Sequence, residues 1–310
     1  MGKRVSDLRR YLRVAVPAAL IGIVGFLAAP NAHAVTCNNV WDGSSGDHQY
    51  QTPANWSLNH VPTSTEFACV PGTNLEVIQL TGSPSPVLGV QFLGNGFALN
   101  GDLSVTDTTQ PSTIRNLTHS GGNLTVATGD TMTLKETTLL TGGTLTGGGT
   151  FMTVAGSALT FVSSTQIRSG STLSLGGAAS WTGGNVCLGE ASKLDNAGTL
   201  AMPANGLTIF DCGGATSRVR NLATGAINRT GAAGQGISIQ IPFDNLGTVN
   251  VGPGDFSPGP NSATGSDTGT YNIGSGANVV LQSFGRKFGS TGVVNGPGTL
   301  LVNENVTFAG

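Results

Sequence analysis

The residues best suited to chemistry are two aspartates, Asp195 and Asp244, with Arg218 and Arg220 between them in the sequence. Two carboxylates that converge on one face can act as general acid and base on a glycosidic bond, or can hold calcium. Both aspartates also fall in expected turns, where solvated aspartates are common. We favour this second interpretation, so the sequence assigns no catalytic residue, no metal ligand and no cofactor.

A run of threonines offers a different kind of binding chemistry. On one flat face their hydroxyl groups would suit ice or a polysaccharide, although threonine is equally typical of any half-exposed strand. The residues concerned are Thr131, Thr133, Thr137, Thr138, Thr144, Thr146, Thr150 and Thr153.

The four cysteines are Cys37, Cys69, Cys187 and Cys212, an even number that predicts disulfides in an exported chain. We favour Cys37–Cys69 and Cys187–Cys212, because the members of each pair are close in sequence. A zinc site is the alternative, but no two cysteines have the short spacing that zinc modules use.

Residues 1–34 read as a targeting segment. A basic start precedes an apolar run from Val14 to Ala29, and Ala32-His33-Ala34 matches a signal-peptide cleavage site. Cleavage would remove five of the 14 Lys and Arg and one of the 16 Asp and Glu, leaving a net charge of −6. The sequence therefore predicts a secreted, extracellular protein, with no membrane span after cleavage and no nucleic-acid partner.

The elements that would position these residues are marked by a short repeat. Gly101-Asp102-Leu103-Ser104-Val105 returns as Gly122-Asn123-Leu124-Thr125-Val126 and again from Gly143, always after the same interval. Short apolar pairs at two-residue spacing, separated by glycine turns, continue along the chain. A fixed period of this size predicts an all-β fold, a right-handed parallel β-helix (β-solenoid) with coils of about 21–25 residues.

A second marker shows the coil lengthening. Asn196, Asn221 and Asn245 each open a similar phrase, at a step close to the upper end of that coil length. Such asparagines can bond their own backbone or stack on the asparagine of the next coil. Cys187 and Cys212 are separated by the same longer step, so we expect their disulfide to join adjacent coils, which lie about 4.8 Å apart.

Residues 35–84 lack the repeat and are expected to form an N-terminal cap rich in tryptophan and cysteine, before a solenoid over residues 85–310. Trp41 and Trp56 would plug the open core, and the alternative is an exposed carbohydrate platform. Their setting, Trp41-Asp42-Gly43 followed by Asn55-Trp56 and Val61-Pro62, resembles the opening of many bacterial secreted and surface β-helix proteins. Residues 252–268 hold three prolines without apolar periodicity, which predicts a loop insertion.

The C-terminal segment carries a second resemblance. Gly269-Thr270-Tyr271, then Gly298-Thr299-Leu300, then Val306-Thr307-Phe308 is similar to the repeat unit of bacterial adhesin-like and autotransporter-like β-helix proteins. The resemblance implies a non-enzymatic structural or adhesive module that binds glycans, matrix, extracellular polysaccharide or a cell surface.

Two alternatives to this module stay open. One is a β-helical polysaccharide lyase or glycoside hydrolase. The other is an ice-binding or self-assembling surface protein, in which the strand edge at the end of the solenoid would pair end to end with a second chain.

Overall fold

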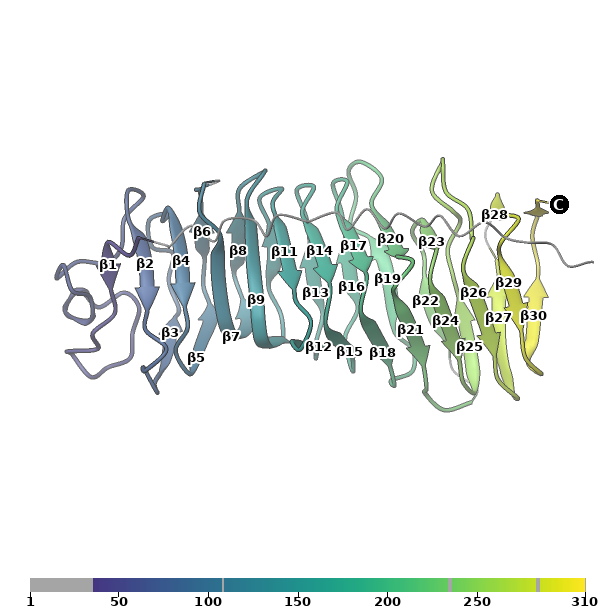
Figure 1. Cartoon of the computed structure of the whole chain (residues 1–310), viewed down its shortest axis with the longest axis horizontal. Coiled ribbons are helices and arrows are strands. Elements are labelled where there is room, and N and C mark those ends of the chain that lie inside the picture. Colours follow the sequence, from purple (N-terminus) through teal and green to yellow (C-terminus); the bar gives the residue numbers. More distant parts are fainter. Residues whose placement is uncertain (1–35, 108, 234–235, 283–284, 310) are drawn as a thin grey trace, which may run out of the picture. The chain divides into compact units, whose positions relative to one another are not determined.

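The computed structural model describes residues 36–107, 109–233, 236–282 and 285–309, and the predicted signal peptide lies outside them. Parallel strands dominate this part of the chain, and its one helical element is the short 3₁₀ turn η1 (Pro53–Asn55). No helix among the described residues is long and apolar enough to cross a membrane. The expected β-solenoid is confirmed, and it winds through about 11 turns (Figure 1).

Three walls of parallel strands enclose the core. Two of them belong to one 19-stranded sheet and merge at the long strands β7 (Ser112–Gly121) and β9 (Thr131–Leu140), which run through both. The first wall also contains β1 (Asn39–Val40), β2 (Phe67–Val70), β4 (Gly89–Phe92), β11 (Thr150–Thr153), β14 (Thr172–Leu175), β17 (Lys193–Asn196), β20 (Arg218–Asn221) and β23 (Phe243–Asn245). The second also contains β3 (Val77–Leu80), β5 (Gly96–Asn100), β12 (Ala158–Phe161), β15 (Ala178–Trp181), β18 (Thr199–Met202), β21 (Ala226–Arg229), β24 (Thr248–Val251), β26 (Thr270–Ile273) and β29 (Val293–Asn295).

The third wall is a separate 10-stranded sheet. It consists of β6 (Leu103–Val105), β8 (Asn123–Val126), β10 (Thr144–Thr146), β13 (Thr165–Ile167), β16 (Val186–Leu188), β19 (Thr208–Asp211), β22 (Ile237–Ile239), β25 (Gly254–Ser257), β27 (Ala277–Leu281) and β30 (Thr299–Val302). The short strands β28 (Arg286–Phe288) and β31 (Val306–Phe308) pair in parallel as a separate two-stranded sheet.

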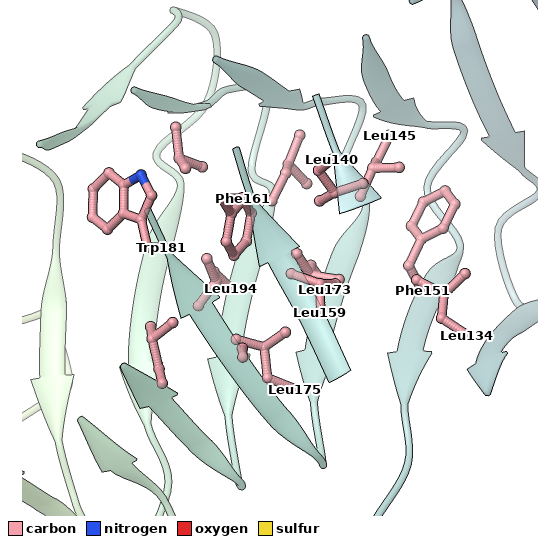
Figure 2. Packing of buried hydrophobic residues seen from close by; sticks show 14 of the residues in the cluster. Leu134, Leu140, Leu145, Phe151, Leu159, Phe161, Leu173, Leu175, Trp181 and Leu194 are labelled. Atoms are coloured by element: carbon pink, nitrogen blue, oxygen red, sulfur yellow. The ribbon is translucent and has the colours of Figure 1, made fainter. Parts of the chain in front are cut away.

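Residues at equivalent positions of the sequence repeat pair with one another on adjacent coils. Leu103 pairs with Leu124 and Leu124 with Leu145, each one coil further on. Alternate residues of a strand face opposite sides, so each register position inside the walls becomes a stack that runs along the solenoid. Figure 2 shows such a stack, in which Leu140, Phe161 and Trp181 follow one another on β9, β12 and β15. All three side chains are buried.

Aromatic side chains fill the N-terminal end of the core. Trp56 and Tyr50 are fully buried and pack edge to face, and the Trp56 indole Nε1–H donates to the Tyr50 carbonyl at 2.8 Å. Trp41 is also buried and lies 5.2 Å from Trp56 between ring centroids. Burial of both tryptophans excludes the exposed carbohydrate platform.

The expected boundary at residue 84 does not appear in the strand pairing. Strands β1, β2 and β3 lie before it, and they pair in parallel with one another or with β4 and β5 of the solenoid. The disulfide Cys37–Cys69, with Cα atoms 5.7 Å apart, ties the segment before β1 to β2. The N-terminal segment is therefore built as the first coils of the stack.

The expected loop insertion at residues 252–268 is corrected in the same way. Its residues 254–257 form β25, which pairs with β22 and β27 in the third wall. Further on, the Asp267 carboxylate accepts from Arg286 at 2.6 Å, with both side chains fully buried. Arg286 lies over the Phe243 ring, 5.6 Å from its centroid, and also binds the Tyr271 hydroxyl. The segment therefore contributes a strand and a buried ion pair to the solenoid.

A buried column of asparagines lines the first wall. Asn196, Asn221 and Asn245 are in register, and all three are fully buried. The Asn196 Nδ2 donates to Asn221 Oδ1 at 2.8 Å, and the Asn221 Nδ2 donates to Asn245 Oδ1 at 2.9 Å. We call this column the inner ladder, and it confirms the stacking that the spacing predicts.

The last described coil exposes apolar side chains. Leu301, Val302 and Phe308 are 39%, 47% and 59% exposed. End-to-end association through this coil stays a prediction.

Candidate functional site

The outer face of the third wall carries a hollow of about 630 Å³ that spans five successive strands, from β8 to β19. Its lining combines backbone at one corner of the solenoid with amide, hydroxyl, guanidinium and aromatic side chains. We call this hollow the Phe210 groove.

Glycines make the floor at that corner. Gly122 and Gly143 have φ of +68° and +73°, a conformation that side chains rarely adopt. They also stack closely, because a Cβ on Gly122 would overlap the Gly101 carbonyl group. The glycines that start the repeated phrase therefore allow the coils to approach, and they leave the corner without side chains.

His119 lies directly beneath this floor. It is fully buried, in register between Leu99 and Leu140, and a Cβ on Gly143 would overlap its ring. Neither ring nitrogen has a hydrogen-bond partner among the described residues. Burial lowers the pKa of His119, against a smaller effect of the Gly121 and Gly122 backbone that raises it, so the ring is neutral at neutral pH. His119 therefore contributes shape rather than charge to the groove.

Polar side chains from β13 and its flanking turns stand along the groove. Gln166 and Arg168 are fixed against each other, because the Arg168 Nε–H donates to Gln166 Oε1 at 2.9 Å. Arg168 also faces Glu190 at 3.5 Å. On the next coil, Asn185 Oδ1 accepts from the Thr208 backbone N–H at 3.1 Å, and its amide nitrogen has no partner among the described residues.

An outward-facing aromatic ring completes the groove. Phe210 sits between the inward Ile209 and the exposed Asp211 on β19, and it is only partly covered. Its register partner is Cys187, and Cys212 follows two positions later. The disulfide Cys187–Cys212 is present, with Cα atoms 5.6 Å apart, and joins adjacent coils as expected. It crosses the strands diagonally beside Phe210, so the sequence step between the cysteines is not a register step.

The aspartates singled out in the sequence lie together on the outer face of the first wall. Asp195 pairs in register with Arg220, and Arg220 with Asp244. Arg220 donates from Nε and Nη2 to the two Asp195 oxygens at 2.9 and 2.6 Å, and these hydrogen bonds raise the pKa of Arg220. Asp244 Oδ1 accepts from the Ser262 backbone N–H at 3.0 Å, and its Oδ2 accepts from the Ser262 hydroxyl at 2.5 Å. Both carboxylates are thus engaged within the protein.

Arg218 does not join them. It pairs in register with Lys193 on the neighbouring strand, and its Nε has no hydrogen-bond partner among the described residues. No group of three or more His, Cys, Asp or Glu side chains in the described ranges could hold a metal ion. Arg220 lies between the two aspartates in register and forms an ion pair with Asp195, while Asp244 is hydrogen-bonded to Ser262.

The threonines expected to share a face are dispersed. Thr138 and Thr153 point into the core and are 2% exposed. The others divide among all three walls, with Thr131, Thr133 and Thr150 on the first, Thr137 on the second, and Thr144 and Thr146 on the third. The expectation that these threonines share one flat face is therefore wrong.

Sequence reasoning missed Phe210, Gln166 and Asn185. With Leu207 and Ile209 as inward residues, the alternation of a strand places Phe210 on the outer face, so a usable signal was present for this residue.

No family model, curated protein or solved structure matches the chain.

Proposed function

We propose that this chain is a secreted, non-enzymatic β-solenoid that binds extracellular polysaccharide in the Phe210 groove. The observation that carries the proposal is the partly covered Phe210 ring on the outer face of β19, beside Gln166, Arg168 and Asn185. An aromatic ring covers the C–H face of a sugar, while planar amides and a guanidinium bind its hydroxyl groups. A large apolar element with a few converging polar groups is the usual composition of a ligand site.

Two disulfides support the extracellular assignment, because such bonds form and persist in oxidising compartments. Asp195 and Asp244 are both engaged in hydrogen bonds within the protein, which favours binding over catalysis. A hydrolase needs one carboxyl group that can give up a proton and another that can attack or activate water.

The lyase or hydrolase is the second candidate, because Asp195 and Asp244 do flank one arginine on one face. It predicts release of reducing ends from a bound glycan, and loss of that release in Asp195→Asn. Turnover of this kind would contradict the binding module.

A glycan array with the full secreted chain tests the proposal. Phe210→Ala is expected to weaken binding to the glycans that score by about tenfold or more. Phe308→Ala is the matched control, since it removes another exposed ring from the last described coil. Equal binding by both variants, or no glycan bound by the wild type, would contradict the proposal.

A further inference from the structure

A second asparagine column runs along the outside of the second wall. Strands β21, β24, β26 and β29 place Asn228, Asn250, Asn272 and Asn295 at one outward register position. Each Nδ2 donates to the Oδ1 of the preceding asparagine, at 2.7, 2.8 and 3.3 Å along the column. We call it the outer ladder. The four strands lie next to one another in the C-terminal half of the solenoid (Figure 1).

The conformational preference of strands does not account for this choice of residue. Asparagine is among the residues depleted in strands, and these four side chains are partly or fully exposed. A hydrogen bond that water can replace contributes little to folding. Four successive strands that place asparagine at one outward position, against the local preference, point to a role in binding.

A shallow hollow of about 640 Å³ lies beside the outer ladder. Glycines after the strands keep it open. A Cβ on Gly252 would lie 2.9 Å from the Arg229 carbonyl oxygen, and one on Gly274 would lie 3.2 Å from that of Val251. The hollow therefore offers a surface bare of side chains at its glycines on one side and a row of amides on the other.

The side chains around the outer ladder indicate which kind of ligand it could bind. The second outward row on these strands is Ala226, Thr248, Thr270 and Val293, so neither row carries a charged side chain. Arg229 also lines the hollow, but it is fully buried. Each ladder amide still has a free N–H and a free lone pair, which suits a neutral partner that both donates and accepts. The amides recur at each coil, about every 4.8 Å, which suits a linear ligand made of repeating units.

We propose that the outer ladder and its hollow bind a neutral, linear polysaccharide that lies along the solenoid axis. This site is on a different wall from the Phe210 groove, and the argument for it does not depend on that groove.

The test measures binding of the full chain to chitohexaose and cellohexaose by calorimetry. The Asn250→Ala/Asn272→Ala double variant is expected to bind at least about tenfold more weakly than the wild type. Thr150→Ala/Thr172→Ala is the matched control, because it removes two registered polar side chains from the outside of the first wall, and it should bind within about twofold of wild type.

Asn272→Asp keeps the shape of the ladder and adds a charge, so it should also lose affinity while its melting temperature stays near that of the wild type.

Full affinity in both asparagine variants would overturn the inference, as would a wild type that binds neither oligosaccharide. Loss in Phe210→Ala alone would support the groove and refute the ladder. Loss of affinity in the asparagine variants alone would support the ladder and refute the groove. A change of oligomeric state in place of glycan binding would show a protein interface and would also overturn the inference.

Discussion

The inner and outer ladders place the same residue in the same coil-to-coil geometry, but in opposite surroundings. Asn221 is fully buried and its Nδ2 donates both to Asn245 and to the Thr248 carbonyl. Asn250 is partly exposed, and its Nδ2 donates to Asn228. Inside the walls, a polar group that loses its hydrogen bond is left desolvated at a cost in free energy. On the outer surface, water can take the place of the lost partner. The comparison teaches that the inner ladder holds the coils together, while the outer ladder is free to serve a ligand.

The largest effect is expected from breaking the inner ladder. Asn221→Ala removes the acceptor of Asn196 and the donor to Asn245, so we expect the free energy of unfolding to fall by about 3 kcal/mol. Urea unfolding followed by circular dichroism measures the change. A loss below about 0.5 kcal/mol would remove the distinction between the two ladders.

The Asp130 carboxylate is a buried group with only one of its two oxygens hydrogen-bonded, so we expect its replacement to stabilise the fold. Asp130 is buried, and its Oδ2 has no hydrogen-bond partner among the described residues. Burial raises its pKa from 3.8 to about 6, against the Thr131 backbone N–H, which lowers it. The folded state therefore holds the proton more tightly, and its advantage is lost as pH rises from about 4 through about 6.

Asp130→Asn is accordingly expected to raise the free energy of unfolding at pH 7 by about 1–2 kcal/mol. Thermal unfolding between pH 4 and pH 7 is the measurement, and the stability difference between variant and wild type should shrink toward pH 4. A difference that is constant over this range would show that ionisation of Asp130 is not the cause.

His119 gives a smaller effect and the reverse pH dependence. Its pKa is lowered below the ordinary 6.5, so the unfolded chain binds the proton more tightly and stability falls as pH drops below that value. His119→Leu matches its register neighbours Leu99 and Leu140 and should stabilise the fold by about 1 kcal/mol at neutral pH. Melting curves of wild type and variant should diverge further between pH 6.5 and pH 5, and parallel curves would argue against the mechanism.

The smallest effect is expected at the outer ladder. Asn272→Ala should change the free energy of unfolding by less than about 0.5 kcal/mol, because water replaces the lost hydrogen bonds. The same urea titration as for Asn221→Ala compares the two directly. A loss as large as that of Asn221→Ala would mean that both ladders are structural.

Much of the fold could be predicted from the sequence, because a solenoid repeats its signals at each coil. The glycines from Gly101 to Gly143 mark a corner where only glycine fits, and the asparagines from Asn196 to Asn245 open a phrase with its own glycine and threonine. Both cysteine pairs were also readable, since each is close in sequence. In each case a local residue type matches the position that the fold requires.

The outer ladder was harder to recognise for a physical reason. Asn228, Asn250 and Asn272 sit mid-strand between different neighbours, with no turn residue to mark them. Arg286 was hidden for another reason, because a charged side chain is expected outside. Its burial became acceptable only through Asp267 and Tyr271, which come from other strands or turns. The Phe210 groove was also hard to predict, because it is lined by side chains from several coils. The repeat period alone does not determine which of these side chains point outward.

The two ladders also differ in whether their direction can be reversed. In the inner ladder the Nδ2 groups donate to the carbonyl oxygens of Ala226, Thr248 and Thr270 as well, so each amide has one orientation. In the outer ladder the amides Asn250, Asn272 and Asn295 donate toward the N-terminal coils, and turning all four amides together would preserve every bond of the column. The outer surface can therefore present either of two polarities, and a chain with distinct ends, such as a glycan with one reducing terminus, would select between them as it binds.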